Sequence, residues 1–267
     1  MIQKFMSKLS VGALVLFVIP IMLVGVSKAQ DATATPAPLP HWEYEGNTDG
    51  PGQWGQLDDR FAACSTGKAQ SPIDLKSPVE ASLTNIKFDY KPSALNIFNN
   101  GHTVQVNYDA GSSITFNETK YDLLQFHFHH PSEHTLDGKA FAMELHFVHK
   151  SAAGNLAVVG VMITEGKENE ALKSVFDNLP TTKGDPQPTQ LMTDAGKIIP
   201  HNAGYYTYSG SLTTPPCTEG VRWLVLNQPI ELSAAQIEAF GKIFELDARP
   251  VQALNDRDLL EDTTAGS

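Results

Sequence analysis

The sequence predicts a mainly β protein, built as a single domain around a large central twisted sheet that is mostly antiparallel, with a few peripheral helices. Three observations support this fold class. Short segments in which apolar and polar residues alternate recur along the chain. Amphipathic helical patterns are few. From position 41 onward, the chain shows no internal repeat and no stretch typical of a linker between domains.

The predicted strands are rich in β-branched and aromatic residues, which suit a pleated and half-buried surface. We expect them at 103–107, 113–117, 121–130, 141–149, 156–163 and 221–226. A turn at 131–140 separates the third segment from the fourth, and Asp137-Gly138 within it is a favourable turn pair. These two strands can therefore pair as a hairpin.

Two segments carry a helical pattern. Residues 167–179 place an apolar stripe on one face, made of Ala171, Leu172, Val175, Phe176 and Leu179. Residues 232–244 begin with Ser233 and carry Gln236 three positions later, which is the pattern of a capping box. We expect both helices at the periphery of the sheet.

The N-terminus resembles an export signal. Lys4 and Lys8 precede an apolar run at 11–26, and small residues lead up to Ala29, so we expect a signal peptide at 1–29. The alternative is a retained membrane anchor, but the run is shorter than the ~20 residues of a spanning helix. Residues 30–40 are rich in proline and small residues and predict a flexible linker. The protein is then periplasmic or secreted, without a stable membrane anchor after cleavage.

The charge of the chain narrows the range of partners. The formal net charge is −11, and removal of Lys4, Lys8 and Lys28 with the signal peptide makes it −14. An acidic surface repels nucleic acid and anionic lipid, so we expect neither as a partner. Such a chain suits a soluble protein that acts on a small molecule.

The chain has two cysteines, Cys64 and Cys217. An even number of cysteines in an exported protein favours a disulfide, and two buried free thiols are the alternative. A bridge across so long a loop would add roughly 4–5 kcal/mol to the free energy of unfolding in the chain-entropy model.

Four histidines crowd the segment QFHFHHPSEHT at 125–135. Because side chains alternate across a strand, Gln125, His127 and His129 share one face, and Phe126 and Phe128 take the other. His130 has the parity of the phenylalanines, so we expect it to pack. The role of His134, in the turn, is open on parity alone, and we expect it to brace the turn by hydrogen bonding.

The next strand repeats the pattern. Glu144 and His146 share a face, and His149 lies on the other with the packing residues. If the polar faces of the hairpin coincide, His127, His129 and His146 converge. Three protein ligands leave a fourth tetrahedral position open, as in a catalytic zinc site. Gln125 and Glu144 can each accept a hydrogen bond from an imidazole and so orient it. The alternative is that these residues are ordinary polar positions on a solvated sheet face.

Five blocks of sequence together closely resemble the exported bacterial α-class carbonic anhydrases. They are NNGHTVQV, QFHFHHPSEHT, MELHFVHK, LAVVGVM and YSGSLTTPPCTEGVRWLVL, in this order. The resemblance runs from about His41 to Val251, and implies that residues 41–267 form an α-carbonic anhydrase catalytic domain. The H-x-H pattern alone is a weak signal, whereas the ordered set of blocks is specific.

The resemblance implies the following roles. His127, His129 and His146 bind Zn²⁺. Thr213 accepts a hydrogen bond from zinc hydroxide and donates its own proton to Glu133, while His102 matches the proton shuttle, with an ordinary turn histidine as the alternative. A solvent-accessible histidine has a pKa near ~6.5, which suits that role. The positions that match the water network are Tyr44, Asn100 and Gln105, and those that match the substrate pocket are Val148, Val158, Leu212, Thr214, Val221 and Trp223.

The sequence departs from many relatives at a few of these positions. Gln105 stands where many carry asparagine, and His130 stands where many animal relatives carry tryptophan. Cys64 and Cys217 match the disulfide of exported members, where the bridge anchors the loop that holds Thr213. The oligomeric state is left open, with a homodimer as one option.

The implied activity is reversible hydration of carbon dioxide to bicarbonate and a proton. Two alternatives belong to other classes of protein. One is a catalytically silent, zinc-binding relative of carbonic anhydrase, although such relatives usually lack one of the zinc histidines. The other is a zinc hydrolase that acts on esters.

Overall fold

The computed structural model describes residues 37–186 and 189–264. The chain divides into two units, Met1–Pro38 and Leu39–Ser267, and every described helix and strand belongs to the second. The predicted signal peptide and most of the predicted linker therefore lie outside the described residues, and those two predictions stay untested. Within the described ranges, no helix is both long and apolar enough to cross a membrane.

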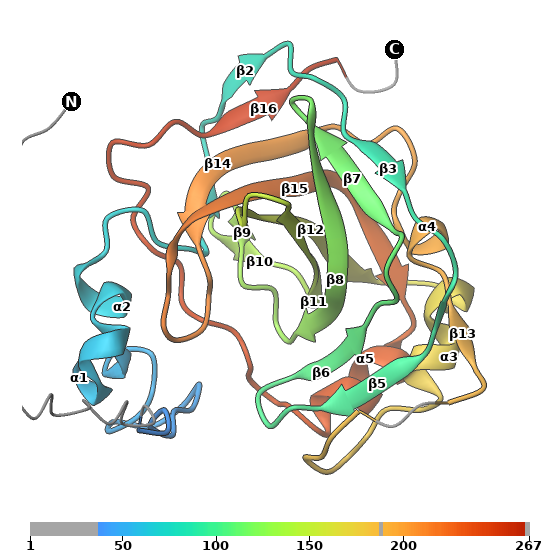
Figure 1. Ribbon diagram of the computed structural model, residues 1–267, viewed down its shortest axis with the longest axis horizontal. Helices are drawn as coiled ribbons and strands as arrows, with labels where there is room; N and C mark the ends of the chain where they lie inside the picture. Colours follow the sequence, from blue (N-terminus) through green and yellow to red (C-terminus); the bar gives the residue numbers. More distant parts are fainter. Residues whose placement is uncertain (1–36, 187–188, 265–267) are drawn as a thin grey trace, which may run out of the picture. The chain divides into compact units, whose positions relative to one another are not determined.

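An eleven-stranded twisted sheet forms the centre of the second unit (Figure 1). Nine strands follow one another in the order β2 (Val79–Ala81), β16 (Leu260–Asp262), β14 (Tyr205–Ser211), β15 (Glu219–Leu232), β12 (Leu156–Glu165), β11 (Met143–Ser151), β8 (Thr119–His129), β6 (Val104–Asn107) and β5 (Asn96–Asn99). Off this path, β7 (Ser113–Phe116) pairs with β8, and β3 (Lys87–Asp89) pairs with β7.

The prediction of a mainly β, mostly antiparallel fold is confirmed. Among the described pairs of this sheet, β12–β15 and β16–β2 are parallel and the others are antiparallel. Two smaller sheets join β1 (Asp74–Leu75), β9 (Thr135–Leu136) and β10 (Lys139–Ala140), and β4 (Ser93–Ala94) with β13 (Met192–Thr193). All six predicted strands form, with ends that differ by a few residues.

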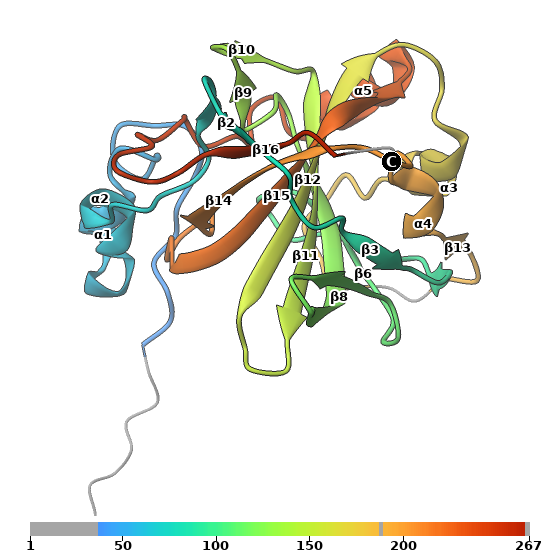
Figure 2. The ribbon, with the colours of Figure 1, turned by 90° about the horizontal axis from the view of Figure 1, so that it is seen from above.

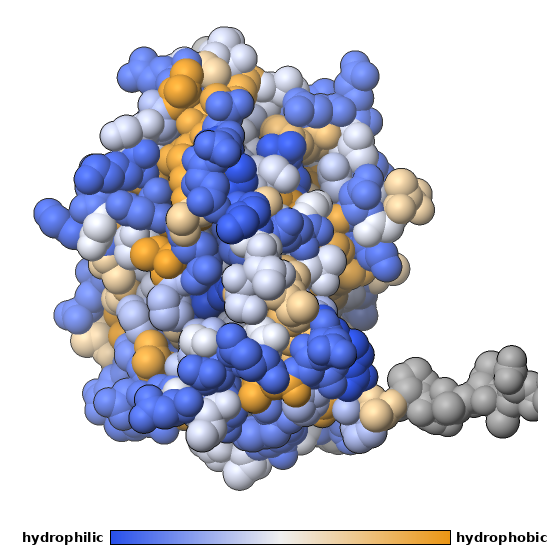
Figure 3. All heavy atoms as spheres, turned by 90° about the vertical axis from the view of Figure 1, so that its left-hand side faces the viewer, coloured by the Kyte–Doolittle hydropathy of each residue, from blue (hydrophilic) through white to orange (hydrophobic). Residues whose placement is uncertain are grey.

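Short helices surround the sheet, as Figures 1 and 2 show from two directions. On one side lie α1 (Trp54–Leu57), the 3₁₀ helix η1 (Asp59–Phe61) and α2 (Ala63–Thr66). On the other side lie η2 (Glu170–Leu172), α3 (Lys173–Phe176), α4 (Ala195–Ile198) and α5 (Ala234–Gly241). Hydrophilic residues cover most of the face that bears α1 and α2, with apolar areas between them (Figure 3).

The two helix predictions have different outcomes. Helix α5 begins with the predicted capping box, in which Ser233 and Gln236 bond reciprocally. The predicted helix at 167–179 is wrong in length, because only η2 and the single turn of α3 form there. Asn169 caps the segment by accepting a hydrogen bond from Leu172 N, which starts it as a 3₁₀ turn. Pro180 follows closely and disfavours continuation, because it restricts the residue before it to extended backbone.

Two apolar clusters cover the sheet. The larger contains Phe126, Phe128 and Phe147, all fully buried, as parity predicts for that face. The smaller contains Val158, Val225 and Trp223. The polar residues that parity assigns to one face of β8 and β11 therefore lie within a well-packed sheet, where their geometry is fixed.

Candidate metal centre and surrounding cavity

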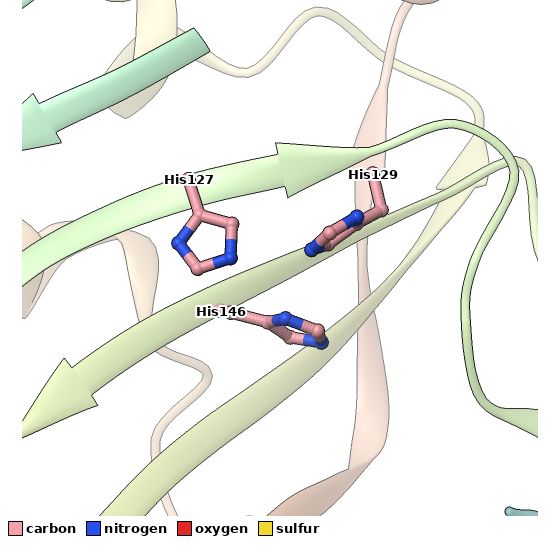
Figure 4. A group of neighbouring side chains, drawn as sticks. All are labelled: His127, His129 and His146. Atoms are coloured by element: carbon pink, nitrogen blue, oxygen red, sulfur yellow. The ribbon is translucent and has the colours of Figure 1, made fainter. Parts of the chain in front are cut away.

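The three histidines predicted as ligands converge on one point. β8 and β11 pair antiparallel with His127 directly opposite His146 and His129 opposite Glu144, so the polar faces coincide as predicted. One ring nitrogen from each histidine lies within 4.8 Å of those of the other two. Figure 4 shows the three rings turned toward one another, two from one strand and one from its neighbour.

Each ring is oriented by a hydrogen bond on its far side. His127 Nδ1 donates to Gln125 Oε1 at 2.8 Å, and His146 Nε2 donates to Glu144 Oε1 at 2.9 Å. These are the two partners that the sequence predicted. His129 Nδ1 donates to the backbone carbonyl of Asp247 at 2.7 Å, a partner that sequence reasoning missed.

The three imidazoles suit a metal ion. Burial lowers the pKa of His129 to about 4, and it also lowers the pKa values of His127 and His146, so all three are neutral near pH 7. A neutral imidazole is the form that binds a metal. His129 Nε2 is buried without a hydrogen-bond partner, which is costly unless something occupies that nitrogen. The donor set and the unpaired nitrogen therefore fit Zn²⁺.

Glu144 joins the metal centre to the turn behind it. Its Oε2 accepts from the backbone N–H groups of Glu133 and His134, and its Oε1 accepts from His134 Nδ1 at 2.8 Å. Burial alone raises the pKa of Glu144, but His134 and His146 beside it hold that pKa well below its usual value. Gly160 lies directly opposite His146 on β12, and a Cβ there would meet Glu144 Oε1 at 3.0 Å. Glycine therefore leaves room for the carboxylate.

His134 braces the turn, as predicted. Its Nε2 hydrogen-bonds the hydroxyl of Tyr208 on β14 at 2.7 Å, and that hydroxyl donates to Ser71 Oγ at 2.9 Å. The turn after β8 is thereby connected to a strand on the far side of β12 and β15. Of the two histidines that parity assigned to packing positions, His149 is buried and His130 is partly exposed. His149 is fully buried and bonds Tyr90, and His130 Nδ1 donates to the Glu245 carbonyl.

Glu133 lies beside the ligands and is fully enclosed. Its Oε2 is 3.5 Å from His129 Nε2, and its Oε1 accepts from the backbone N–H of Arg249 at 2.9 Å. Burial raises the pKa of Glu133 to about 7, although His146, the Arg249 N–H and the Thr213 hydroxyl each lower it. Thr213 and Glu133, far apart in sequence, are therefore neighbours, as the predicted pair requires.

A cavity of about 140 Å³ opens onto two of the three proposed ligands, His127 and His129. Trp42 and Thr103 line this cavity together with most of the predicted polar residues. These are Tyr44, Asn100, His102, Gln105, Gln125, His127, His129 and Thr214. Asn100 Nδ2 donates to Gln105 Oε1 at 3.3 Å, and Asn100 Oδ1 accepts from the backbone N–H groups of His102 and Thr103. The predicted water-network positions thus line one cavity with His127 and His129, whereas His146 does not line it.

The predicted apolar wall lies next to the ligands in the sheet. Val148 pairs with Val158 across β11 and β12, and Val158 pairs with Trp223 across β12 and β15. This row lies two residues along the strands, and on the same face, from the row that contains His127 and His146. Val221 belongs to the same core cluster, and Leu212 packs against it. None of these five residues lines the cavity that contains the polar set.

His102 differs from its expected environment. Its ring stacks on Trp42 with a centroid distance of 3.7 Å and an interplanar angle of 7°, and it is half-buried where we expected solvent access. Burial lowers the pKa of His102 to about 4, and the nearby charges of Lys183 and His41 add to this. The pKa near 6.5 that we assumed is therefore wrong for this conformation. Trp42 carries no periodicity or motif signal that predicts the stacking.

The predicted disulfide is present. Cys64 in α2 bonds Cys217, with their Cα atoms 5.0 Å apart. Cys217 N donates to the Thr214 carbonyl at 2.8 Å, so the bridge is joined to the loop that holds Thr213 and Thr214. The bridge lies in a third apolar cluster with Tyr44, Trp54 and Phe61.

Comparison with known proteins agrees with the fold. Residues 49–262 match the family model for eukaryotic-type carbonic anhydrase. A carbonic anhydrase from a Nostoc species is 46% identical over 227 residues, which span 83% of this chain and 86% of that protein. The chain belongs to the α-carbonic anhydrase family.

Solved structures show the same relationship. A hyperthermostable carbonic anhydrase from an active hydrothermal vent chimney gives a TM-score of 0.80 at 46% identity, covering 83% of this chain and all of that one. The α-carbonic anhydrase of Thermovibrio ammonificans, in complex with the inhibitor sulfanilamide, gives a TM-score of 0.80 at 43% identity, covering 82% of this chain and 98% of that one. The chain is therefore an enzyme of the carbonic anhydrase family.

Proposed function

We propose that this protein catalyses the reversible hydration of carbon dioxide to bicarbonate and a proton, with Zn²⁺ held by His127, His129 and His146. The convergence of three neutral imidazoles, two buried and one partly buried, on one point beside a cavity carries the proposal. Zinc bound by three histidines supplies a hydroxide nucleophile at neutral pH, because it lowers the pKa of water to about 7, the value familiar from carbonic anhydrases.

Thr213 and Glu133 orient the nucleophile in this proposal. The Arg249 N–H holds Glu133 in place, and Glu133 can accept a hydrogen bond from the Thr213 hydroxyl. If the hydroxyl of Thr213 donates to Glu133, its oxygen is left as an acceptor. It can then accept only from the nucleophile, which directs a lone pair of that nucleophile at the substrate carbon.

Carbon dioxide is apolar and offers few directional contacts, so a suitable pocket for it is apolar. We assign this role to Val148, Val158, Leu212, Val221 and Trp223, with Thr214 at the polar edge. Trp223 Nε1 donates to the Ser211 carbonyl at 3.0 Å, so its polar atom is satisfied while its ring faces other apolar groups. Strand pairing holds Val148, Val158 and Trp223 in a row that lies two residues along the strands from the row of His127 and His146.

His102 is the proposed proton shuttle, with Tyr44, Asn100 and Gln105 ordering the path. It lines the same cavity as His127 and His129, which supports the assignment. Its lowered pKa means that the stacked ring is a weak base near neutrality. The shuttle role therefore requires that the ring leave Trp42, or otherwise gain solvent, when it takes up a proton.

The test is a carbon dioxide hydration assay on purified protein. We expect hydration that is lost on treatment with a chelator, restored by added Zn²⁺, and inhibited by an aromatic sulfonamide. Zinc binding without hydration would instead favour the catalytically silent relative. Ester cleavage by itself does not discriminate, because the same nucleophile can attack activated esters; cleavage of esters without hydration would favour the hydrolase.

We further propose that the protein is exported to the periplasm or the medium after removal of residues 1–29, and that 30–40 is a linker to the catalytic domain at 41–267. The disulfide between Cys64 and Cys217 supports an oxidising compartment.

A further inference from the structure

The segment Asp247–Arg249 contacts both halves of the proposed site although it has no regular secondary structure. The carbonyl of Asp247 accepts from His129 Nδ1 at 2.7 Å, and the backbone N–H of Arg249 donates to Glu133 Oε1 at 2.9 Å. A metal ligand and the acceptor for Thr213 are thus oriented by one short piece of backbone. At its first residue the segment is tied to the end of β8, because the Asp247 N–H donates to the His130 carbonyl at 3.1 Å and Asp247 Oδ1 accepts from the His130 N–H.

The side chain of Arg249 restrains the other end of the segment. It is 2% exposed, and its guanidinium spans three acceptors in another part of the chain. Nη1 donates to Gln70 Oε1 at 2.9 Å and to the Ser71 carbonyl at 2.7 Å, and Nη2 donates to the Cys64 carbonyl at 3.0 Å. The guanidinium carbon also lies 5.6 Å from the ring centroid of Trp54.

Only a guanidinium can make this set of contacts, because three acceptors must be bonded by one side chain. The guanidinium donates to carbonyl and amide oxygens, so no carboxylate offsets the cost of burying the charge through a direct hydrogen bond. A planar fork with several donors holds separated acceptors in one fixed geometry, which a lysine ammonium cannot reproduce. The acceptors lie near the disulfide, whose other cysteine is joined to the Thr214 carbonyl.

We propose that Arg249 is a positioning residue for the proposed reaction: its buried guanidinium fixes the segment that orients His129 and Glu133. The inference rests on the proposed function for its catalytic consequence, but not for its effect on the metal centre. Arg249 acts through its own backbone N–H and through Asp247, and ties their geometry to residues 64–71.

The chain offers a matched control in Arg257. Its guanidinium also donates to backbone carbonyls, those of Leu254, Ser209 and Ala253, and lies 5.4 Å from the ring centroid of Tyr208. The segment that it restrains hydrogen-bonds neither His129 nor Glu133, and its contact with Tyr208 is to the ring, whereas His134 bonds the hydroxyl. Arg257→Lys therefore loses a comparable fork without disturbing the two orienting hydrogen bonds.

The experiment compares Arg249→Lys with Arg257→Lys in the zinc-loaded, disulfide-bonded protein. We measure zinc release to a chromophoric chelator, the visible spectrum after substitution with Co²⁺, the thermal midpoint, and kcat and KM for hydration. We expect Arg249→Lys to release zinc about tenfold faster or more, to change the Co²⁺ spectrum and to lower kcat. Arg257→Lys should lower the thermal midpoint without these changes. Equal zinc release and equal spectra in the two variants would overturn the proposal.

Gln70→Leu covers the case in which Arg249→Lys does not fold. It removes one acceptor of the guanidinium and leaves the arginine in place, so we expect faster zinc release than in wild type, by a smaller factor. Unchanged release in Gln70→Leu would then count against Arg249 as a positioning residue. Wild-type protein that binds zinc but does not hydrate carbon dioxide would overturn the proposed function and leave the zinc comparison intact.

Discussion

At the scale of single residues, the site depends on which face of a strand a side chain occupies. Parity alone places His127 and His129 with His146, and it excludes His130 and His149 from the ligand set. The residues that complete the centre are different in kind. Asp247 acts through its carbonyl, and any residue offers a carbonyl, so no side-chain pattern could have indicated it.

Thr213→Ala should lower kcat/KM for hydration by roughly 10²-fold, the order of magnitude lost when one oriented hydrogen-bonding group is removed from an active site. Without the Thr213 hydroxyl, no group between Glu133 and the nucleophile can accept a hydrogen bond and orient that nucleophile. Thr213→Ser keeps the hydroxyl and should retain most of the activity. Stopped-flow hydration at saturating buffer measures both variants. Equal losses in the alanine and serine variants would remove the hydroxyl from the mechanism.

His102→Ala should lower turnover in weak buffer, because the proton then has no side chain to carry it from the cavity. Added imidazole should restore the rate, since it is small and titrates near neutrality. The measurement is kcat at low buffer concentration with increasing imidazole, and in strong buffer as a control. A variant that turns over as fast as wild type in weak buffer would rule out the shuttle role.

At the scale of elements, hydrogen bonds join strands that are far apart in the sheet. The chain of contacts from Glu144 through His134 to Tyr208 crosses from β11 to β14, and it ends at Ser71. The centre is therefore held from behind by a buried polar network. Each member is costly to remove, because its partners stay buried.

Tyr208→Phe should lower the free energy of unfolding by about 1–3 kcal/mol, since it leaves His134 Nε2 and Ser71 Oγ without this partner. It should also speed zinc release, because His134 restrains Glu144. Tyr205→Phe is the matched control: Tyr205 is equally buried, and its hydroxyl donates to the Thr84 carbonyl, away from the centre. Urea denaturation and chelator-driven zinc release measure both effects. If both variants released zinc at the wild-type rate, the network would be purely structural.

Strands were predictable, whereas irregular segments and contacts between distant segments were not. The alternation of β8 and β11 is a local signal that survives in the fold, and so is the capping box of α5. The helix predicted at 167–179 has the right apolar stripe, but Asn169 and Pro180 shorten it, which shows that end signals outweigh periodicity. The stacking of His102 on Trp42 joins residues far apart in sequence, so the lowered pKa of His102 could not be predicted from the sequence.

At the scale of the whole molecule, the sheet separates the site from a large apolar core that also encloses titratable groups. His149 lies on the face of β11 opposite to His146 and is fully buried, with its ring stacked on Tyr90. Burial lowers the pKa of His149 to about 3. The native protein therefore keeps this ring neutral at a pH where an unfolded chain, with a pKa near ~6.5, binds a proton.

This difference makes stability depend on pH in a definite direction. The folded-state pKa is the lower one, so the contribution of His149 is fully present above about pH 6.5 and is lost as pH falls toward about 3. In that window, protonation of His149 in the unfolded chain lowers the unfolding free energy by up to ~1.4 kcal/mol per pH unit. His149→Gln cannot titrate, and its amide can still hydrogen-bond Tyr90, so its stability should fall less steeply with acid.

The measurement is the unfolding free energy of wild type and His149→Gln by urea denaturation between pH 7 and pH 4. Zinc loss at low pH affects both proteins, so the informative quantity is their difference at each pH. We expect wild type to lose its advantage progressively as pH falls below about 6.5. A difference between His149→Gln and wild type that stays constant with pH would mean that the core does not hold this ring neutral.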